Sequence, residues 1–192
     1  TIRLRRGVEI MFADKTGFPK FLGCDRTVEG FARLGYPVEI ARQRAYAGCH
    51  WLAIPGREYT LNDCVKINFA AIFEVAWDDL LANFATPSMG QLWERFVYHL
   101  AQAVESTARC LDFHMEHMHL VYPELVLDLL CHGPIEKGED ASYGGVEFYN
   151  LCIDGAALAT VADSFAAVEQ RVERERRLTW AALRDHLKAN WT

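Results

Sequence analysis

The order of apolar and polar residues along the chain predicts long helices separated by short strands and turns. Apolar residues recur at helical spacing over residues 61–81 and 91–119, which predicts two long helices. The same spacing predicts shorter helices over residues 25–34 and 157–175, and a last helix that Thr179 caps. Long helices that alternate with short apolar runs are typical of an α/β protein.

Short apolar runs beside turn residues predict the strands. Residues 8–12, VEIMF, form an apolar run bounded by charged residues and predict a strand. Residues 49–54 predict a strand or a tight loop, which the Pro55–Gly56 turn closes. Residues 143–150 predict a mixture of turn and strand, and Asp154–Gly155 predicts a further turn.

The composition narrows the possible classes of protein. Of 192 residues, 51% are hydrophobic and 24% are charged, as expected of a globular domain with its own core. The net charge of −6 gives no electrostatic basis for binding nucleic acid or an anionic membrane. No apolar run reaches the roughly 18 residues of a membrane span. We therefore expect a cytoplasmic protein that binds neither nucleic acid nor membrane.

The cysteines predict free thiols rather than a disulfide framework. The chain has six, scattered without any CxxC pair, at positions 24, 49, 64, 110, 131 and 152. This spacing is typical of a reducing compartment, and we expect five of the thiols to be small buried hydrophobes. Cys49 differs in its neighbours, because it follows Gly48 and precedes two bulky residues, His50 and Trp51.

Three segments carry a resemblance to a known family. They read GFPKF with EGFARLGYPVEIARQRAYAGC, then GREYTLNDCVKINFAAIFEVAW, then PIEKGEDASYGGVEFYNLCIDGAALATVADS and the helices after it. Together they resemble the catalytic barrel of the glycyl radical enzymes, the pyruvate formate-lyase-like superfamily, from about Phe12 to the end of the chain. The third segment, with Gly144–Gly145 and Tyr149–Asn150, is the most specific. The resemblance implies that residues 1–192 are a segment of that catalytic domain and part of a ten-stranded β/α barrel.

The resemblance assigns a role to the Gly48–Cys49 pair. In this family a Gly-Cys pair lies at the tip of a loop inside the barrel, where the thiol becomes a thiyl radical that removes a hydrogen atom from the substrate. Cys49 is the matching residue and the implied catalytic residue. Such a thiol needs shielding from oxygen but no lowered pKa, because its S–H bond is broken into atoms and is not ionised.

The sequence departs from the family's pattern two residues after this cysteine. Most dehydratase, choline-lyase and decarboxylase branches carry a glutamate there, and this chain carries Trp51, which can shape a pocket but cannot transfer a proton. His50 and Trp51 are thus candidate substrate-binding residues. His50, Glu58 and Asp63 are the nearest groups that could take over proton transfer. Asp63 also suits a helix N-cap, and Glu58 also suits a solvated loop charge.

Three functional interpretations stay open. The first is anaerobic cleavage of a C–C or C–heteroatom bond in a small organic substrate, as by a lyase, dehydratase or decarboxylase. The second is addition of a hydrocarbon across fumarate, as by an alkyl- or arylsuccinate synthase, which suits Trp51 because it needs no base. The third is a non-catalytic half-barrel that binds a partner. The tail helices favour the first.

The resemblance also implies a cofactor and partners. The family stores its radical on a glycine within an Arg-Val-x-Gly-Phe/Tyr motif, which this sequence does not contain, and the chain begins at Thr1 rather than at methionine. We therefore expect a fragment or a split subunit, inactive alone, whose glycyl radical lies on the remainder of the barrel or on a second chain. Activation would come from a separate radical S-adenosylmethionine enzyme, which would hold the iron–sulfur cluster.

The sequence gives little reason to expect a metal in this chain itself. His114, His117 and His119 form its densest group of ligand-type side chains, and the first two share a helical face. Zinc sites need three or four convergent ligands, and no further residue is obviously placed to complete one. We therefore predict no metal site, and a polar helix end near a packing surface instead.

Overall fold

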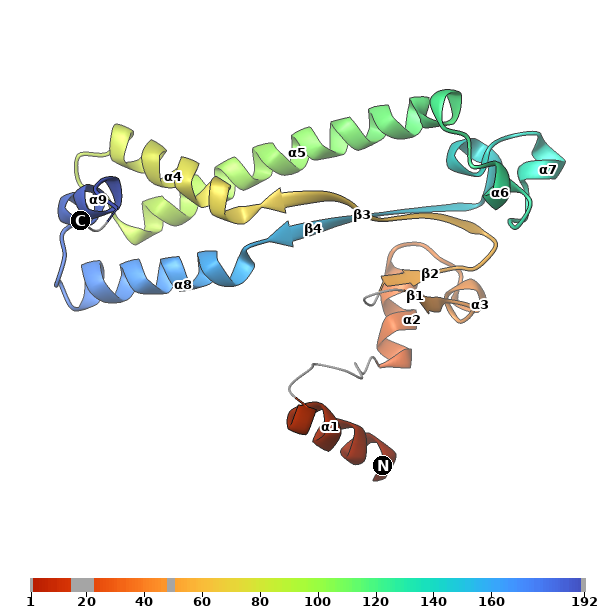
Figure 1. Ribbon diagram of the computed structural model, residues 1–192, viewed down its shortest axis with the longest axis horizontal. Helices are drawn as coiled ribbons and strands as arrows, with labels where there is room; N and C mark the ends of the chain where they lie inside the picture. The colour runs from red at the N-terminus through yellow and green to blue at the C-terminus, as the bar shows by residue number, and fades with distance from the viewer. Residues whose placement is uncertain (1, 15–22, 48–50, 191–192) are drawn as a thin grey trace. The chain divides into compact units, whose positions relative to one another are not determined.

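The chain divides into two compact units, Thr1–Pro55 and Gly56–Thr192. The computed structural model describes residues 2–14, 23–47 and 51–190 (Figure 1). The described elements of the first unit are α1 (Ile2–Asp14), α2 (Cys24–Arg33), α3 (Val38–Ala41), β1 (Ala45–Ala47) and β2 (Trp51–Ala53).

In the first unit, β1 and β2 form an antiparallel pair in which Ala47 lies opposite Trp51. Helices α2 and α3 pack together, and the rings of Phe31 and Tyr36 meet edge to face with their centroids 5.0 Å apart. Arg44, directly before β1, connects this strand to α2 because its guanidinium donates a hydrogen bond to the Cys24 carbonyl oxygen at 3.2 Å.

The strand predicted over residues 8–12 is wrong, because these residues lie within α1. The short apolar run bounded by charged residues suggested a strand. Val8 is also three residues from Met11 and four residues from Phe12, however, which is the spacing of one helical face. The helical spacing therefore describes this segment better than the short apolar run.

The second unit contains most of the regular structure. Its elements are β3 (Glu58–Asn68), α4 (Phe69–Asn83), α5 (Met89–Val121), α6 (Leu125–Asp128), α7 (Pro134–Lys137), the π-helical turn η1 (Ala141–Gly145), β4 (Phe148–Ala156), α8 (Leu158–Val168), the π-helical turn η2 (Glu169–Arg174) and α9 (Trp180–Lys188). Strands β3 and β4 pair in parallel, and the helices from α4 to α7 form the crossover between them. A parallel pair joined through helices confirms the α/β prediction.

The helix predicted over residues 61–81 is wrong in its first eight residues, which belong to β3. The helix begins at Phe69, where the Asn68 side-chain oxygen accepts hydrogen bonds from the amides of Ala70 and Ala71 at 3.0 and 3.2 Å. Asn68 is therefore the N-cap. The N-cap interpretation of Asp63 is wrong, because Asp63 lies inside the strand.

An irregularity in β3 explains why the strand was missed. Leu61 pairs with Leu151 and Val65 pairs with Ile153, so β3 has three residues where β4 has one. The two extra residues keep Tyr59, Leu61, Val65 and Ile67 on one face, but they place the polar residue Asp63 between Leu61 and Val65. Leu61 and Val65 are then four residues apart, which resembles a helical spacing.

Strand β4 continues through the predicted Asp154–Gly155 turn. Gly155 allows close packing here, since a Cβ atom at this position would lie 2.6 Å from the ring of Phe69.

Two helix predictions are confirmed. The helix predicted over residues 91–119 is α5, and the Thr179 cap is confirmed by a 3.1 Å hydrogen bond from the Ala182 amide to the Thr179 hydroxyl.

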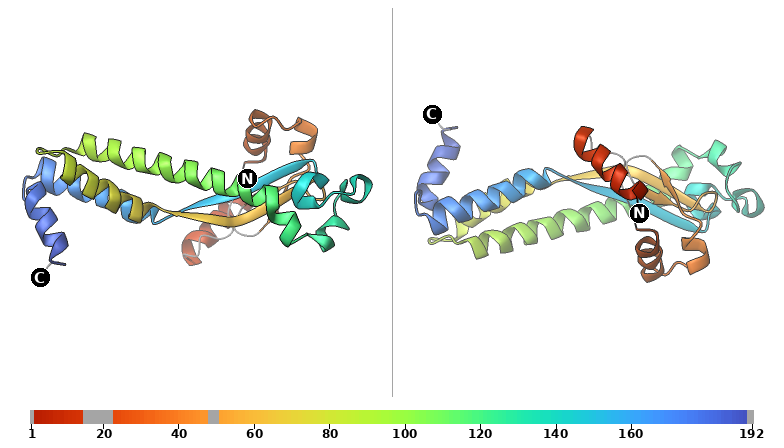
Figure 2. Two further views of the ribbon diagram at one scale, coloured as in Figure 1. Left: turned by 90° about the horizontal axis from the view of Figure 1, so that it is seen from above. Right: turned by 90° about the horizontal axis from the view of Figure 1, so that it is seen from below.

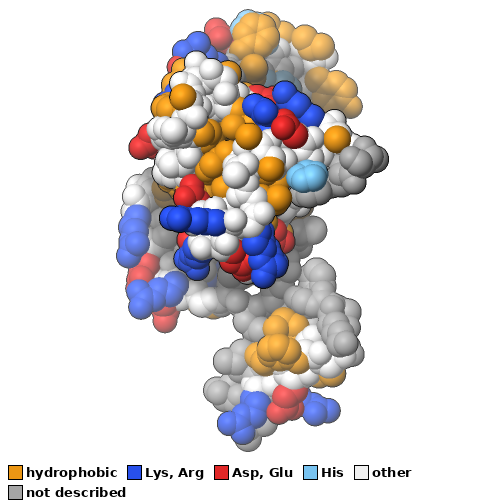
Figure 3. Space-filling model, turned by 90° about the vertical axis from the view of Figure 1, so that its left-hand side faces the viewer, with side chains coloured by type: hydrophobic (Ala, Val, Ile, Leu, Met, Phe, Trp, Pro, Cys, Tyr) orange, Lys and Arg blue, Asp and Glu red, His pale blue; other side chains and the backbone are white. Residues whose placement is uncertain are grey.

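The main hydrophobic core lies where α4, α5, α8 and α9 meet. Its buried members are Trp77, Leu80, Leu92, Val168, Val172 and Leu183. The Trp77 and Trp180 rings, 5.5 Å apart, join α4 to α9. From this core, α5 runs back along the β3–β4 pair (Figures 1 and 2). The surface at the α9 end mixes basic and acidic side chains around smaller apolar areas (Figure 3).

We expect Leu80→Ala to lower the free energy of unfolding by about 2–5 kcal/mol, because it opens a cavity at a fully buried position. Val75 lies on the same helix and is 51% exposed, so Val75→Ala should cost only about 0.5 kcal/mol. Urea denaturation of both variants measures the difference. Similar losses in the two variants would contradict the position assigned to the core.

Candidate functional site on the β3–β4 sheet

The two faces of the β3–β4 sheet differ in chemistry. One face packs on α5: Tyr59 and Leu61 lie in a cluster with Met115 and Met118 of that helix. Residues paired across a parallel ladder point to the same side, so the neighbours between these positions point to the other face. In β/α barrels the helices cover the outside and the other face of each strand points to the interior.

This second face, which we call the polar face, carries most of the titratable side chains of the two strands. Its members are Glu58, Thr60, Cys64 and Lys66 of β3 and Asn150, Cys152 and Asp154 of β4. Ligands of α/β proteins bind beyond the carboxyl ends of parallel strands. Cys64, Lys66 and Asp154 lie in that half of the strands, so the polar face is the candidate site.

Asp63 reaches this face because of the bulge. Its φ angle is +52°, in the left-handed region that non-glycine residues seldom adopt. The side chain hydrogen-bonds to the carboxyl group of Asp154, and this contact is the main reason that the pKa of Asp154 is raised. Partial desolvation and the charge of Asp63 raise the pKa further, and Lys66 opposes them. The bulge thus creates a carboxyl pair that favours holding a proton.

Two cysteines lie beside this carboxyl pair. The Cys64 thiol donates a hydrogen bond to the Cys152 carbonyl oxygen at 2.9 Å. Burial raises the pKa of the Cys152 thiol, and electrostatic interactions with Cys64, Asp154, Asp63 and Glu58 act in the same direction. The prediction of buried cysteines is wrong for the described thiols: Cys24 and Cys110 are exposed, and Cys64, Cys131 and Cys152 are partly exposed.

Glu58 occupies the first position of β3 and is only 6% exposed. The interpretation of Glu58 as a solvated loop charge is therefore wrong. The preceding residue, Arg57, forms an ion pair with Glu147 just before β4 begins. This ion pair and the adjoining Glu58–Phe148 strand pair hold the first residues of β3 and β4 side by side.

The other candidate residues belong to the first unit. Trp51 opens β2 and is partly buried. Cys49 and His50 lie outside the described residues, so their predicted roles stay predictions.

A second polar network ties the amino-terminal end of β3 to the crossover. The Tyr59 hydroxyl donates a 3.0 Å hydrogen bond to the Glu124 carboxylate, and the Glu124 amide donates to the Asp140 carboxylate at 2.7 Å. Burial and the Glu124 hydrogen bond raise the pKa of Tyr59 far above its ordinary value. Asp140 also accepts from the Ser142 amide. Because each of these groups has a protein partner, the network stabilises the fold of this end.

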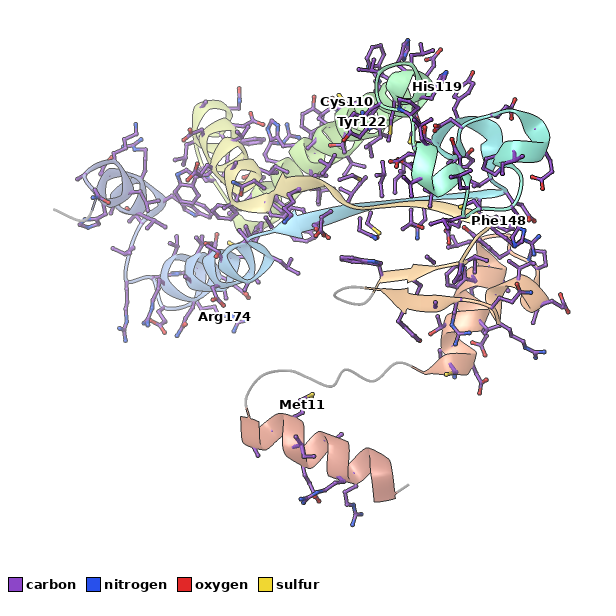
Figure 4. All side chains as sticks on the ribbon, turned by 45° about the vertical axis from the view of Figure 1, so that its right-hand side comes forward. Met11, Cys110, His119, Tyr122, Phe148 and Arg174 are labelled. Atoms are coloured by element: carbon purple, nitrogen blue, oxygen red, sulfur yellow. The ribbon has the colours of Figure 1, made fainter. Side chains whose placement is uncertain are left out.

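The histidines near the end of α5 make packing contacts. The His117 ring stacks on Phe113, and the His119 ring stacks on Tyr143 with centroids 4.0 Å apart. Figure 4 shows His119 and Tyr122 at the end of α5, and Phe148 at the start of β4. Among the described residues no group of three or more His, Cys, Asp or Glu side chains is arranged to hold a metal ion.

Asp63 and Glu58 of this face were predicted from the sequence, whereas Asp154 and the two cysteines were not. The signal was present in β4, where Asn150, Cys152 and Asp154 alternate with Leu151 and Ile153. Alternation of this kind marks a strand with one polar face. The Asp154–Gly155 turn signal obscured it.

Comparison with known proteins places this architecture in a family. Residues 4–192 match the family described as pyruvate formate lyase-like. The chain is 24% identical to a (2S)-3-sulfopropanediol dehydratase of Klebsiella oxytoca, over 91% of this chain and 23% of that protein. It is also 24% identical to an isethionate sulfite-lyase of Bilophila wadsworthia, over 92% and 23% of the respective chains.

Solved structures show the same fold. A protein studied for 1,2-propanediol dehydration in Roseburia inulinivorans aligns with a TM-score of 0.76 at 18% identity, over 87% of this chain and 22% of that one. The chain therefore belongs to the pyruvate formate lyase-like family of the glycyl radical enzyme superfamily and has the fold of part of its barrel. It spans about a quarter of the length of the curated relatives it matches.

The long helix α5 is not a membrane span. No helix within the described ranges combines the length and the apolar character needed to cross a bilayer.

We expect the Asp63–Asp154 pair to make stability depend on pH. The raised pKa of Asp154 means that the pair contributes stability in acid, which is lost as pH rises through that pKa and Asp154 ionises next to Asp63. Asp154→Asn should therefore unfold at a higher temperature than the wild type at neutral pH. The difference should vanish below about pH 4, near the pKa of an unfolded aspartate.

Thermal unfolding at several pH values measures this effect. Asp78→Asn, at an exposed position of α4, is the matched control and should keep the wild-type pH profile. An Asp154→Asn profile parallel to that of the wild type would show that the two carboxyl groups do not interact.

Proposed function

We propose that this chain is part of a glycyl radical lyase that breaks a C–heteroatom bond in a small organic substrate. The observation that carries the proposal is the family match over residues 4–192, together with relatives named as a dehydratase and a sulfite-lyase. The first removes water and the second releases sulfite, so both names describe loss of a heteroatom group from carbon. Carboxylate-rich chemistry on the polar face supports the same interpretation.

Cys49 is the proposed hydrogen-abstracting residue. It stands in the Gly-Cys pair to which the family resemblance assigns this role. When present, a glycyl radical supplies the one-electron oxidation that turns a cysteine thiol into a hydrogen-atom acceptor. We propose that its glycine lies on the remainder of the barrel or on a second chain, and that a radical S-adenosylmethionine enzyme generates it.

Proton transfer is the second requirement of such a reaction. A hydroxyl group leaves carbon readily only when it is protonated, so elimination of water needs a nearby acid. Trp51 cannot supply one. We propose that Asp63 does, with Asp154 as its partner, because the hydrogen bond between the two carboxyl groups raises the pKa of Asp154 and keeps a proton on the pair. Glu58, buried at the start of the same strand, is the alternative acid.

Trp51 and His50 are proposed to line the substrate pocket. An aromatic wall also suits an apolar substrate, so Trp51 is the one observation that favours the fumarate-adding alternative. That reaction needs no acid or base, and it gives no role to the carboxyl groups of the polar face. A non-catalytic half-barrel would need none of these residues.

We expect Cys49→Ala to reduce turnover by the activated, complete enzyme to the detection limit, because alanine has no S–H bond. Cys110→Ala, at an exposed position of α5, should retain wild-type turnover. The assay compares small diols and hydroxy- or sulfonate-bearing substrates with fumarate plus an aromatic hydrocarbon. Product from the last pair alone would support the fumarate-adding reaction, and an active Cys49→Ala would exclude the radical role.

We expect Asp63→Asn to lower kcat by about 10²–10⁴-fold with a smaller change in KM, the range typical of losing a general acid or base. Asp78→Asn is the control for a surface charge on the adjoining helix. A parallel Glu58→Gln variant tests the alternative acid. If Glu58→Gln shows the larger loss and Asp63→Asn is active, Glu58 takes the proposed role and Asp63 does not.

A further inference from the structure

The polar face contains a pair of thiols that the proposed reaction does not use. Cys64 comes directly before Val65, and Cys152 comes directly before Ile153, the residue that pairs with Val65. The two cysteines therefore lie side by side on neighbouring strands and project from the same face. The hydrogen bond from the Cys64 thiol to the Cys152 carbonyl oxygen, 2.9 Å long, confirms this closeness.

The spacing of the strands suits a covalent bond between these thiols. The regular ladder resumes at Val65 and Ile153, directly after the two cysteines, and adjacent strands of a regular ladder lie about 4.8 Å apart. Disulfides join cysteines whose Cα atoms are about 4.4–6.8 Å apart. Both side chains are partly exposed, so a small oxidant can reach them. The remaining described cysteines, Cys24, Cys110 and Cys131, lie on other elements or in the loop after α6.

We propose that Cys64 and Cys152 are a redox modification site, at which a hydroperoxide converts the two thiols to a disulfide that joins β3 to β4. The proposal rests on the register of the two strands and is independent of the function proposed above. It concerns the reduced protein on exposure to oxidant, which is consistent with free thiols in a reducing compartment.

The chemistry requires one hydroperoxide and two thiols. The Cys64 sulfur attacks the peroxide, the O–O bond breaks, and Cys64 sulfenic acid and water form when the oxidant is hydrogen peroxide. The Cys152 sulfur then attacks the sulfenic sulfur; the S–O bond breaks, the S–S bond forms, and a second water leaves with the Cys152 proton. Both sulfurs are oxidised and the peroxide is reduced.

The surroundings of the two thiols divide these roles. Burial and nearby carboxylates raise the pKa of Cys152, so it is a poor first nucleophile and suits the second step. A disulfide between Cys64 and Cys152 would lie at the bulge, where the regular ladder is interrupted between the Leu61–Leu151 and Val65–Ile153 pairs. A disulfide there would bridge the interruption and remove both S–H groups from the polar face.

The test treats the purified protein with hydrogen peroxide, blocks the remaining thiols by alkylation and digests with trypsin. Cleavage after Arg57, Lys66, Lys137 and Arg171 places Cys64 in peptide 58–66 and Cys152 in peptide 138–171. The expected product is these two peptides joined, lighter by two hydrogens than their sum and separated by dithiothreitol. Cys64→Ser and Cys152→Ser should both abolish it, and Cys110→Ser should not.

Two results would overturn the proposal. One is full alkylation of Cys64 and Cys152 at a peroxide dose that oxidises the exposed Cys24 and Cys110. The other is a link from either cysteine to peptide 45–57, which contains Cys49. Both are read from the wild-type protein, so the test does not depend on whether the serine variants fold.

Discussion

The parallel pairing of β3 with β4 is the constraint on which the second unit depends. Two parallel neighbours cannot be joined by a short turn, so the chain between them must travel back along the sheet. Helices α4 and α5 form this return path, and α5 packs against Tyr59 and Leu61, so the polar side chains of the strands lie on the opposite face of the sheet. One pairing therefore determines both where the core lies and where polar side chains can gather.

The bulge in β3 shows how this regular frame accommodates chemistry. Three residues opposite one interrupt the ladder and place Asp63 at φ +52°, an arrangement that local backbone energy disfavours. This arrangement brings Asp63 into contact with Asp154. In an unbroken strand the alternation of side chains would place the two residues on opposite faces of the sheet. The irregularity therefore lies at the place where the strands carry their ionisable groups, as is common for bulges near functional sites.

The sequence predicted the α/β class, the long helix α5, the Thr179 cap and the family, because each has a strong local signal. It failed over β3, where Asp63 in the bulge interrupts the alternation of apolar residues that would have revealed a strand. It also failed at Gly155, where the sequence predicted a turn. The structure requires glycine there because the ring of Phe69 packs against this position. The meeting of Asp63 with Asp154 depends on strand register, which no local pattern encodes.

The length of α5 has a consequence for how the second unit responds to change. Leu92 near its start belongs to the core with Trp77 and Leu80, and Met118 near its end contacts Tyr59. At 1.5 Å per residue these two anchoring regions lie about 40 Å apart along the helix. Perturbations so far apart, with no shared neighbours, combine additively. Residues at one end of α5 can therefore be substituted without compensating substitutions at the other end, provided that the segment between the two regions stays helical.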